Sequence, residues 1–148
     1  MTRWIILGLV LAGLAAPPCR AETGLADPKP SFDNPRKVVF QLSTGDPRAI
    51  NNLLFNVVNV QKFYGMDNVR IAVVAFGDGV SALYRETSPV RPRIESLLKY
   101  DIEFIACGNT LSAANRKPED LIPGVAVVTA GIAEIVERTL RGWVYIRP

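Results

Sequence analysis

An almost uninterrupted apolar run at residues 69–76 (VRIAVVAF) places the strongest constraint on how this chain can fold. The run ends at Gly77-Asp78-Gly79, and its length suits a strand better than a helix. A strand with apolar side chains on both faces has to be covered on both faces, and such strands belong to parallel sheets. The chain is therefore expected to build a parallel sheet with helices packed on each side.

The segments around this run alternate between strand-like and helix-like patterns. Apolar residues recur at helical spacing after Pro47, which suits a first helical turn, and Gly65 suits the end of that helix. The last helix, before Gly142, is predicted to bury one face, made of Ile132, Ile135, Val136 and Leu140. Strands are also predicted at residues 37–42, 102–107, 125–128 and 144–146, and helices at residues 47–65, 92–100 and 110–115, with a short one near 80–84.

This alternation predicts the fold class. Strands that alternate with helices give an α/β protein, and right-handed crossovers place the helices on both faces of the sheet. The expected architecture is a three-layer α/β/α sandwich with a mostly parallel sheet of about five strands. Residues 37–148 are expected to form this single domain, and residues 22–36, rich in proline and polar residues, a flexible N-terminal arm.

The first residues of the chain indicate export. Arg3 is followed by an apolar run from Ile5 to Ala16, and a small residue stands at Ala21. That run is shorter than the roughly 20 residues needed to span a bilayer, and a basic start with a small-residue cleavage site is typical of signal peptides. Residues 1–21 are predicted to be a signal peptide, which makes the mature protein periplasmic or secreted, with no membrane span. The alternatives are a retained membrane anchor and a lipoprotein modified on Cys19.

Composition excludes several classes of function. The chain has no histidine, which removes Ser-His and Cys-His catalysis and the usual histidine-based metal sites. No spacing of other residues suggests a metal site. Loss of Arg3 and Arg20 with the leader lowers the net charge of +3 to about +1. There is no basic stripe with interleaved aromatic residues, so nucleic-acid binding has little support.

One cysteine, Cys107, remains after removal of the leader, and it is the leading candidate for a catalytic residue. It ends a predicted strand, and the helix predicted after it would bring N–H groups and a positive dipole end near the sulfur, which favours the thiolate. A lone thiol in an exported domain is unusual, because such domains pair their cysteines or lack them. The alternative is that Cys107 is a small buried hydrophobic residue.

Three loops are expected to meet at one edge, because ligands gather at the carboxyl ends of parallel strands. They supply the candidate binding residues, and in each loop ordinary turn or capping chemistry is the alternative explanation. The candidates are Ser43, Thr44 and Gly45 after the first strand, Gly77 and Asp78 after the second, and Gly108, Asn109 and Thr110 after the third.

The segments KVVFQLSTGDP, AFGDGV, EFIACGNTL and PGVAVVTAGIAEIVERTLRGWVYIRP, in this order, resemble the DsrE/DsrF-like family in its exported single-domain branch. The resemblance spans about residues 37–148. It implies a flavodoxin-like fold without a bound flavin or other cofactor, assembled as a homotrimer or hexamer. Cytoplasmic relatives act as sulfur carriers in tRNA thiolation and in dissimilatory sulfur oxidation, with a persulfide on a cysteine that Cys107 matches by position.

Two functional hypotheses follow. The first is a sulfurtransferase or sulfur carrier in which Cys107 accepts sulfane sulfur from a donor and passes it to a partner thiol. A single cysteine suits this role, because it can hold a persulfide but cannot close an internal disulfide. The second is a non-enzymatic module that binds a small ligand or anion with the convergent loops, with Cys107 only lining the pocket.

Overall fold

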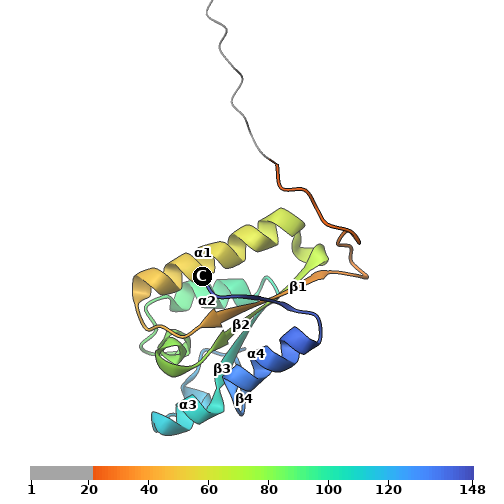
Figure 1. Cartoon of the computed structure of the whole chain (residues 1–148). Coiled ribbons are helices and arrows are strands. Elements are labelled where there is room, and N and C mark those ends of the chain that lie inside the picture. Colours follow the sequence, from red (N-terminus) through yellow and green to blue (C-terminus); the bar gives the residue numbers. More distant parts are fainter. Residues whose placement is uncertain (1–21) are drawn as a thin grey trace, which may run out of the picture.

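Five parallel strands form the centre of the computed structural model, which describes residues 22–148 (Figure 1). The sheet order is β4-β3-β2-β1-β5, so the apolar run that the sequence singled out lies in the central strand. The parallel α/β fold is confirmed, and the predicted strands differ from the observed ones by one residue at most. The strands are β1 (Arg36–Leu42), β2 (Val69–Ala75), β3 (Ile102–Cys107), β4 (Ala126–Val128) and β5 (Val144–Ile146).

Helices cover both faces of the sheet. Helices α1 (Pro47–Tyr64) and α2 (Arg91–Leu98) lie on one face, and α4 (Gly131–Leu140) lies on the other (Figure 1). A short helix, α3 (Gly108–Ala113), continues directly from β3. Short 3-10 helices complete the chain at Met66–Asn68, Gly77–Leu83 and Pro118–Asp120.

Local signals explain where α1 begins and ends. The Asp46 carboxylate accepts a hydrogen bond from the Ala49 N–H at 2.9 Å, which satisfies one of the free amides of the first turn. Pro47 occupies the first turn, where its missing N–H has no consequence. The helix ends at Gly65, whose φ of 83° is costly for residues with a side chain.

Two apolar cores of unequal size hold the layers together. The core under α1 and α2 contains twenty-three buried residues, among them Phe40, Leu54 and Phe104. The core under α4 contains only Val39, Ala72, Val74, Ile105 and Ile135. Because side chains alternate along a strand, Cys107 points to the same face of β3 as Ile105, which is the α4 face.

The predicted buried face of α4 is wrong for three of its four residues. Only Ile135 is buried, whereas Ile132, Val136 and Leu140 are 56%, 52% and 77% exposed. Arg138 turns toward the sheet instead, one helical turn from Ile135, and is 9% exposed.

The buried cation on α4 is fully paired. Arg138 forms ion pairs with Glu103 of β3 at 2.8 Å and with Glu134 at 2.7 Å, and its guanidinium lies 4.4 Å from the centre of the Trp143 ring. Burial lowers the pKa of Arg138, but the two carboxylates outweigh it and the net direction is upward. The three exposed residues Ile132, Val136 and Leu140 are called the α4 stripe below.

Other elements differ from expectation only at their ends. The helix predicted at 110–115 begins two residues earlier, directly after Cys107, and the one predicted near 80–84 is the 3-10 helix Gly77–Leu83. Residues 22–35 form neither helix nor strand and are largely exposed. The predicted signal peptide lies outside the described residues. Among residues 22–148, no helix combines the length and apolarity that a membrane span requires.

Candidate functional site

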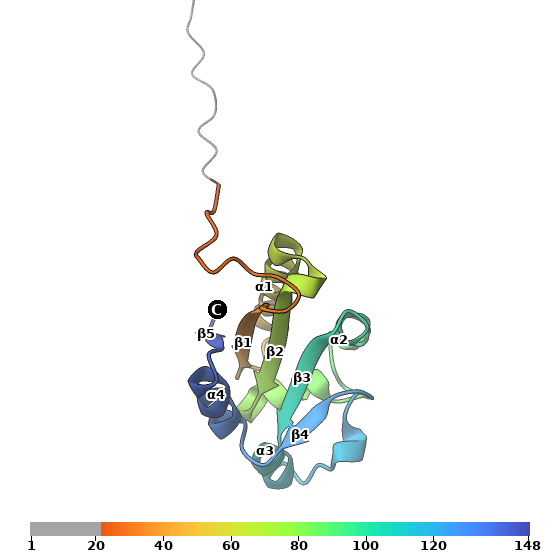
Figure 2. The same ribbon diagram turned by 90° about the vertical axis from the view of Figure 1, so that its right-hand side faces the viewer.

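The loops after β1, β2 and β3 are in direct contact at the carboxyl edge of the sheet. The Gly77 N–H donates a hydrogen bond to the Thr110 hydroxyl at 3.2 Å, which joins the second loop to the third. A Cβ atom at Gly45 would lie 3.4 Å from both the Asp78 carbonyl and the Ser81 hydroxyl, so the first loop packs on the second. Figure 2 shows α3 and the loop that leads to α4 at this same end of the sheet. The geometry thus brings most of the candidate residues together.

Cys107 stands where β3 ends and α3 begins. It is 6% exposed, and its thiol faces the Thr129 carbonyl with a sulfur–oxygen distance of 4.0 Å. The Asn109 N–H donates to the same carbonyl at 3.0 Å. Gly108 permits this close packing, because a Cβ there would come within 3.1 Å of the Val128 carbonyl.

A second helix also begins at the sulfur. Gly131 is the first residue of α4, and a Cβ placed on it would lie only 3.1 Å from the Cys107 Cβ. Among the groups that lower the pKa of Cys107, the Gly131 N–H has the largest effect, and it lies at the amide end of a ten-residue helix. The sulfur therefore lies between the start of α3 and the start of α4.

These contacts set the acidity of the thiol. Burial raises the pKa of Cys107, but hydrogen bonds from the Gly131 amide, the Thr110 hydroxyl and the Thr110 and Asn109 amides lower it. The net direction is downward, so the pKa of Cys107 lies below that of an ordinary cysteine. The lowered pKa raises the fraction of Cys107 that is thiolate at a given pH, and the thiolate is the nucleophilic form of cysteine.

The sequence-based candidates omitted Gly131, the main donor to the sulfur. The same reasoning that selected the first three loops applies to the fourth, since Thr129-Ala130-Gly131 follows β4 at the same edge. Its contacts with the site come from backbone groups, the Thr129 carbonyl and the Gly131 N–H. That is why a search for reactive side chains passed over it.

Ser43 and Thr44 are occupied by local hydrogen bonds. The Ser43 hydroxyl accepts from the Gln41 side-chain amide at 3.0 Å, and the Thr44 hydroxyl accepts from the Asp46 N–H at 3.1 Å. The side-chain oxygen of Gln41, Oε1, accepts a hydrogen bond from the Tyr145 hydroxyl of β5. These bonds are of the kind that stabilise a tight turn between a strand and a helix.

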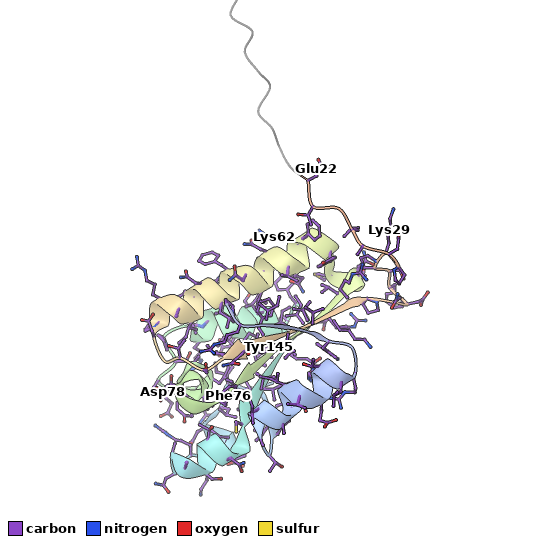
Figure 3. The ribbon with its side chains drawn as sticks, in the orientation of Figure 1. Glu22, Lys29, Lys62, Phe76, Asp78 and Tyr145 are labelled. Carbon is purple, nitrogen blue, oxygen red and sulfur yellow. The ribbon has the colours of Figure 1, made fainter. Side chains whose placement is uncertain are left out.

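A cavity of about 540 Å³ opens beside the cysteine, between the second loop and α3. Its walls include Gly77, Asp78, Tyr84 and Thr110, and Cys107 is not among the residues that line it. Figure 3 shows Phe76 and Asp78 at this end of the molecule. In residues 22–148 no group of three acidic, cysteine or histidine side chains is arranged to hold a metal ion.

Solved structures with the same fold come from bacteria and archaea. Protein MTH1491 of unknown function from Methanobacterium thermoautotrophicum is 38% identical, covers 76% of this chain and 99% of its own, and has a TM-score of 0.73. The YchN protein of E. coli is 17% identical over 77% of this chain and 99% of its own, with a TM-score of 0.64. BT1422, of unknown function, from Bacteroides thetaiotaomicron is 20% identical over 76% of this chain and 94% of its own, with a TM-score of 0.60.

YchN and BT1422, at 17% and 20% identity, show a shared fold and nothing more. No curated protein matches the sequence. The sequence model of the DsrE/DsrF-like family matches residues 36–148, which include every strand and helix of the described structure. The chain is therefore a member of the DsrE/DsrF-like family.

Proposed function

We propose that this protein carries sulfane sulfur as a persulfide on Cys107 and passes it to a thiol of a partner protein. Membership of the DsrE/DsrF-like family supports a role in sulfur relay at a coarse level. The observation that carries the finer proposal is the Cys107 sulfur held between the starts of α3 and α4, with its pKa lowered by the Gly131 and Thr110 hydrogen bonds. The same donors that stabilise a thiolate also stabilise the anionic outer sulfur of a persulfide.

Both half-reactions are thiol–persulfide exchanges that balance without an oxidant. The Cys107 thiolate attacks the outer sulfur of a donor persulfide or inorganic polysulfide, a new S–S bond forms, and the donor leaves as a thiolate or shortened polysulfide. An acceptor thiolate then attacks the outer sulfur on Cys107 and releases the Cys107 thiolate. No histidine is available in the chain as a base, so the first step depends on the thiolate already being present.

Intact-mass analysis of the purified protein tests this proposal. Brief exposure to polysulfide, followed by its removal, should leave an adduct of about 32 Da, the mass of one sulfur atom. The Cys107→Ser variant should show no adduct, and adding glutathione to the loaded protein should return it to the starting mass. A folded wild-type protein that stays unmodified, or an adduct that Cys107→Ser retains, would contradict the proposal.

A ligand-binding module remains the second candidate, because a 540 Å³ cavity bounded by Asp78, Tyr84 and Thr110 lies at the same edge of the sheet as the cysteine. Gly77, Asp78 and Thr110 would contact the ligand, whereas Ser43, Thr44 and Gly45 would support the loop. The two candidate functions differ in whether they require the Cys107 thiol. Ligand binding in the cavity should survive Cys107→Ser, whereas sulfur transfer should not.

We further propose that the protein acts outside the cytoplasm after removal of residues 1–21, on the strength of the leader pattern in the sequence. The intact-mass experiment addresses this as well when the protein is recovered from its producing cells. Its mass should correspond to a chain that begins near Glu22, and a chain that retains Met1 would contradict export with cleavage.

We propose, finally, that the protein is a homo-oligomer, a trimer or hexamer, and that the α4 stripe forms part of the contact. Ile132, Val136 and Leu140 follow one another at successive turns and are all more than half exposed. Adjacent exposed apolar side chains of this kind mark protein–protein contacts. The stripe is on α4, whose first residue, Gly131, packs against Cys107, so the contact would border the site.

Sedimentation velocity should therefore give a mass of several chains at micromolar concentration. Val136→Asp places a charge in the centre of the α4 stripe and should shift the protein toward the monomer. Phe63→Asp, a matched change at an exposed residue on α1, should leave the mass unchanged. A wild-type mass equal to one chain would contradict the assembly, and an unchanged Val136→Asp mass would contradict this surface.

A further inference from the structure

A second cavity, of about 530 Å³, lies between α1 and α2 on the face of the sheet opposite α4 and Cys107. Its walls are mainly apolar and come from Val58, Met66, Leu97 and Tyr100. The cavity is called the α1–α2 groove here. Its size and apolar walls are those of small-molecule sites, which place a few polar groups around an apolar pocket.

The charges around the α1–α2 groove are of one sign. Lys62 from α1 and Arg93 from α2 line it, and no acidic side chain does. Figure 3 shows Lys62 on α1, far from the end of the sheet where Phe76 and Asp78 lie. The Gln61 side chain donates a hydrogen bond to the Tyr100 carbonyl at 2.7 Å and so ties the end of α1 to the residues that follow α2.

Arg93 is half-buried and has no anionic partner among the described residues. Its guanidinium lies 4.0 Å from the centre of the Phe55 ring, and Nη1 donates to the Asn51 side-chain and backbone oxygens at 3.0 and 3.4 Å. Burial lowers the pKa of Arg93. Within residues 22–148, no carboxylate lies within ion-pair distance of Arg93, and Nε and Nη2 make no hydrogen bond.

We propose that the α1–α2 groove binds a small amphiphilic carboxylate, such as a medium-chain fatty acid, whose carboxylate pairs with Arg93 and whose chain lies along the apolar walls. The free Nε and Nη2 donors of one guanidinium match the two oxygens of one carboxylate. The apolar walls at Val58, Met66 and Leu97 match a hydrocarbon chain. Lys62 adds a second positive charge at the rim.

Isothermal titration of the purified protein with decanoate, below its micelle concentration, tests the proposal, with methyl decanoate as the uncharged probe. Decanoate should bind with one site per chain, and the ester should bind about tenfold more weakly because it cannot pair with Arg93. Arg93→Gln should lose about the same factor for decanoate and little for the ester. The matched control is Arg91→Gln on the same helix, whose side chain is already paired with Glu95, and it should bind decanoate as the wild type does.

Two further variants keep the test decisive if Arg93→Gln fails to fold. Lys62 and Met66 are exposed, so replacing them does not disturb the core. Lys62→Gln should weaken decanoate binding several-fold, and Met66→Trp should weaken the binding of both probes by filling the mouth of the groove. Absence of decanoate binding at millimolar concentration, or equal binding of acid and ester, would overturn the proposal. A lower oligomeric mass in Met66→Trp, without a decanoate signal, would assign the groove to a second copy of the chain.

Discussion

Iodoacetamide should alkylate Cys107 in the folded protein, with an apparent pKa below that of a free cysteine. The physical reason is the excess of hydrogen-bond donors around the sulfur, led by the Gly131 amide and the Thr110 hydroxyl, over the opposing effect of burial. The measurement is the rate of alkylation against pH, followed by mass spectrometry. A thiol that reacts only after the protein is unfolded would make Cys107 a core residue.

Gly131→Ala should slow this alkylation at neutral pH by roughly three- to tenfold, the effect of weakening one hydrogen bond. The added methyl group would lie 3.1 Å from the Cys107 Cβ and 3.3 Å from a Val74 methyl carbon, so the first turn of α4 has to move away from the sulfur. Ala133→Val adds bulk to the same turn on its exposed side and should leave the rate unchanged. Equal rates in Gly131→Ala and the wild type would show that the amide does not activate the thiol.

The lowered pKa also makes stability depend on pH in a defined direction. A group whose pKa is lower in the folded state favours folding when it is ionised, so its contribution is present above the unfolded pKa and is lost as the pH falls through the folded pKa. The free energy of unfolding of the wild type, measured relative to Cys107→Ser, should therefore increase with pH through the range in which the thiol titrates. A constant difference across that range would contradict the direction given for the folded-state pKa.

Gly79→Ala should be the most destabilising small substitution in the domain, at about 3 kcal/mol, a large part of the stability of a domain of this size. A Cβ there would lie 2.2 Å from the Leu42 carbonyl oxygen and 2.6 Å from its carbon, which are backbone atoms that no rotamer change can move. The 3-10 helix after β2 would have to separate from the end of β1. Urea unfolding monitored by circular dichroism measures the loss.

Two alanine substitutions calibrate that result. Gly77→Ala meets no atom within 4 Å but has a φ of 53°, so it should cost only about 1–2 kcal/mol of backbone strain. Gly24→Ala, in the segment before β1, also meets nothing within 4 Å and should change stability by less than about 0.5 kcal/mol. If Gly79→Ala lowered the free energy of unfolding no more than Gly77→Ala does, the close contact described between Gly79 and the end of β1 would be contradicted.

The sheet was predictable because its strands carry their own signals. The run in β2 is apolar on both faces, which only a central parallel strand requires, and β3 ends at Cys107 as predicted. Hydrophobic periodicity succeeded for α1, where the buried residues Ile50, Leu53, Leu54 and Val57 lie on one face. The boundaries of α1 followed from Pro47 and Gly65, whereas the capping bond of Asp46 was found only in the structure.

Periodicity failed for α4 because the helix has two faces that both contain apolar residues. Ile135 packs on the sheet and the α4 stripe does not, and the sequence pattern does not distinguish them. The burial of Arg138 depends on Glu103, which is 35 residues away and has no helical relation to it. Pairings of this kind are set by tertiary structure, which a local pattern does not record.

The sequence predicted which loops meet at the candidate site, but it did not predict which groups donate hydrogen bonds to the Cys107 sulfur. The rule that loops meet at the carboxyl ends of parallel strands brought Gly77, Thr110 and Cys107 together correctly. The donor that matters most for the sulfur is the backbone N–H of Gly131, and a backbone amide has no signature in the residue type. Ser43 and Thr44 have the hydroxyl groups that a binding loop needs. In the structure these hydroxyls instead accept hydrogen bonds from the Gln41 side-chain amide and the Asp46 N–H.

The unequal cores set the order in which the layers open. The layer held by the fewest buried residues has the lowest free energy of local opening, and here that layer is α4, fastened mainly by Ile135 and the ion pairs of Arg138. Amide protons of α4 are accordingly expected to exchange with solvent before those of β2. Opening of α4 would uncover the Cys107 sulfur but would withdraw the Gly131 N–H from it, so accessibility and thiolate stabilisation are opposed.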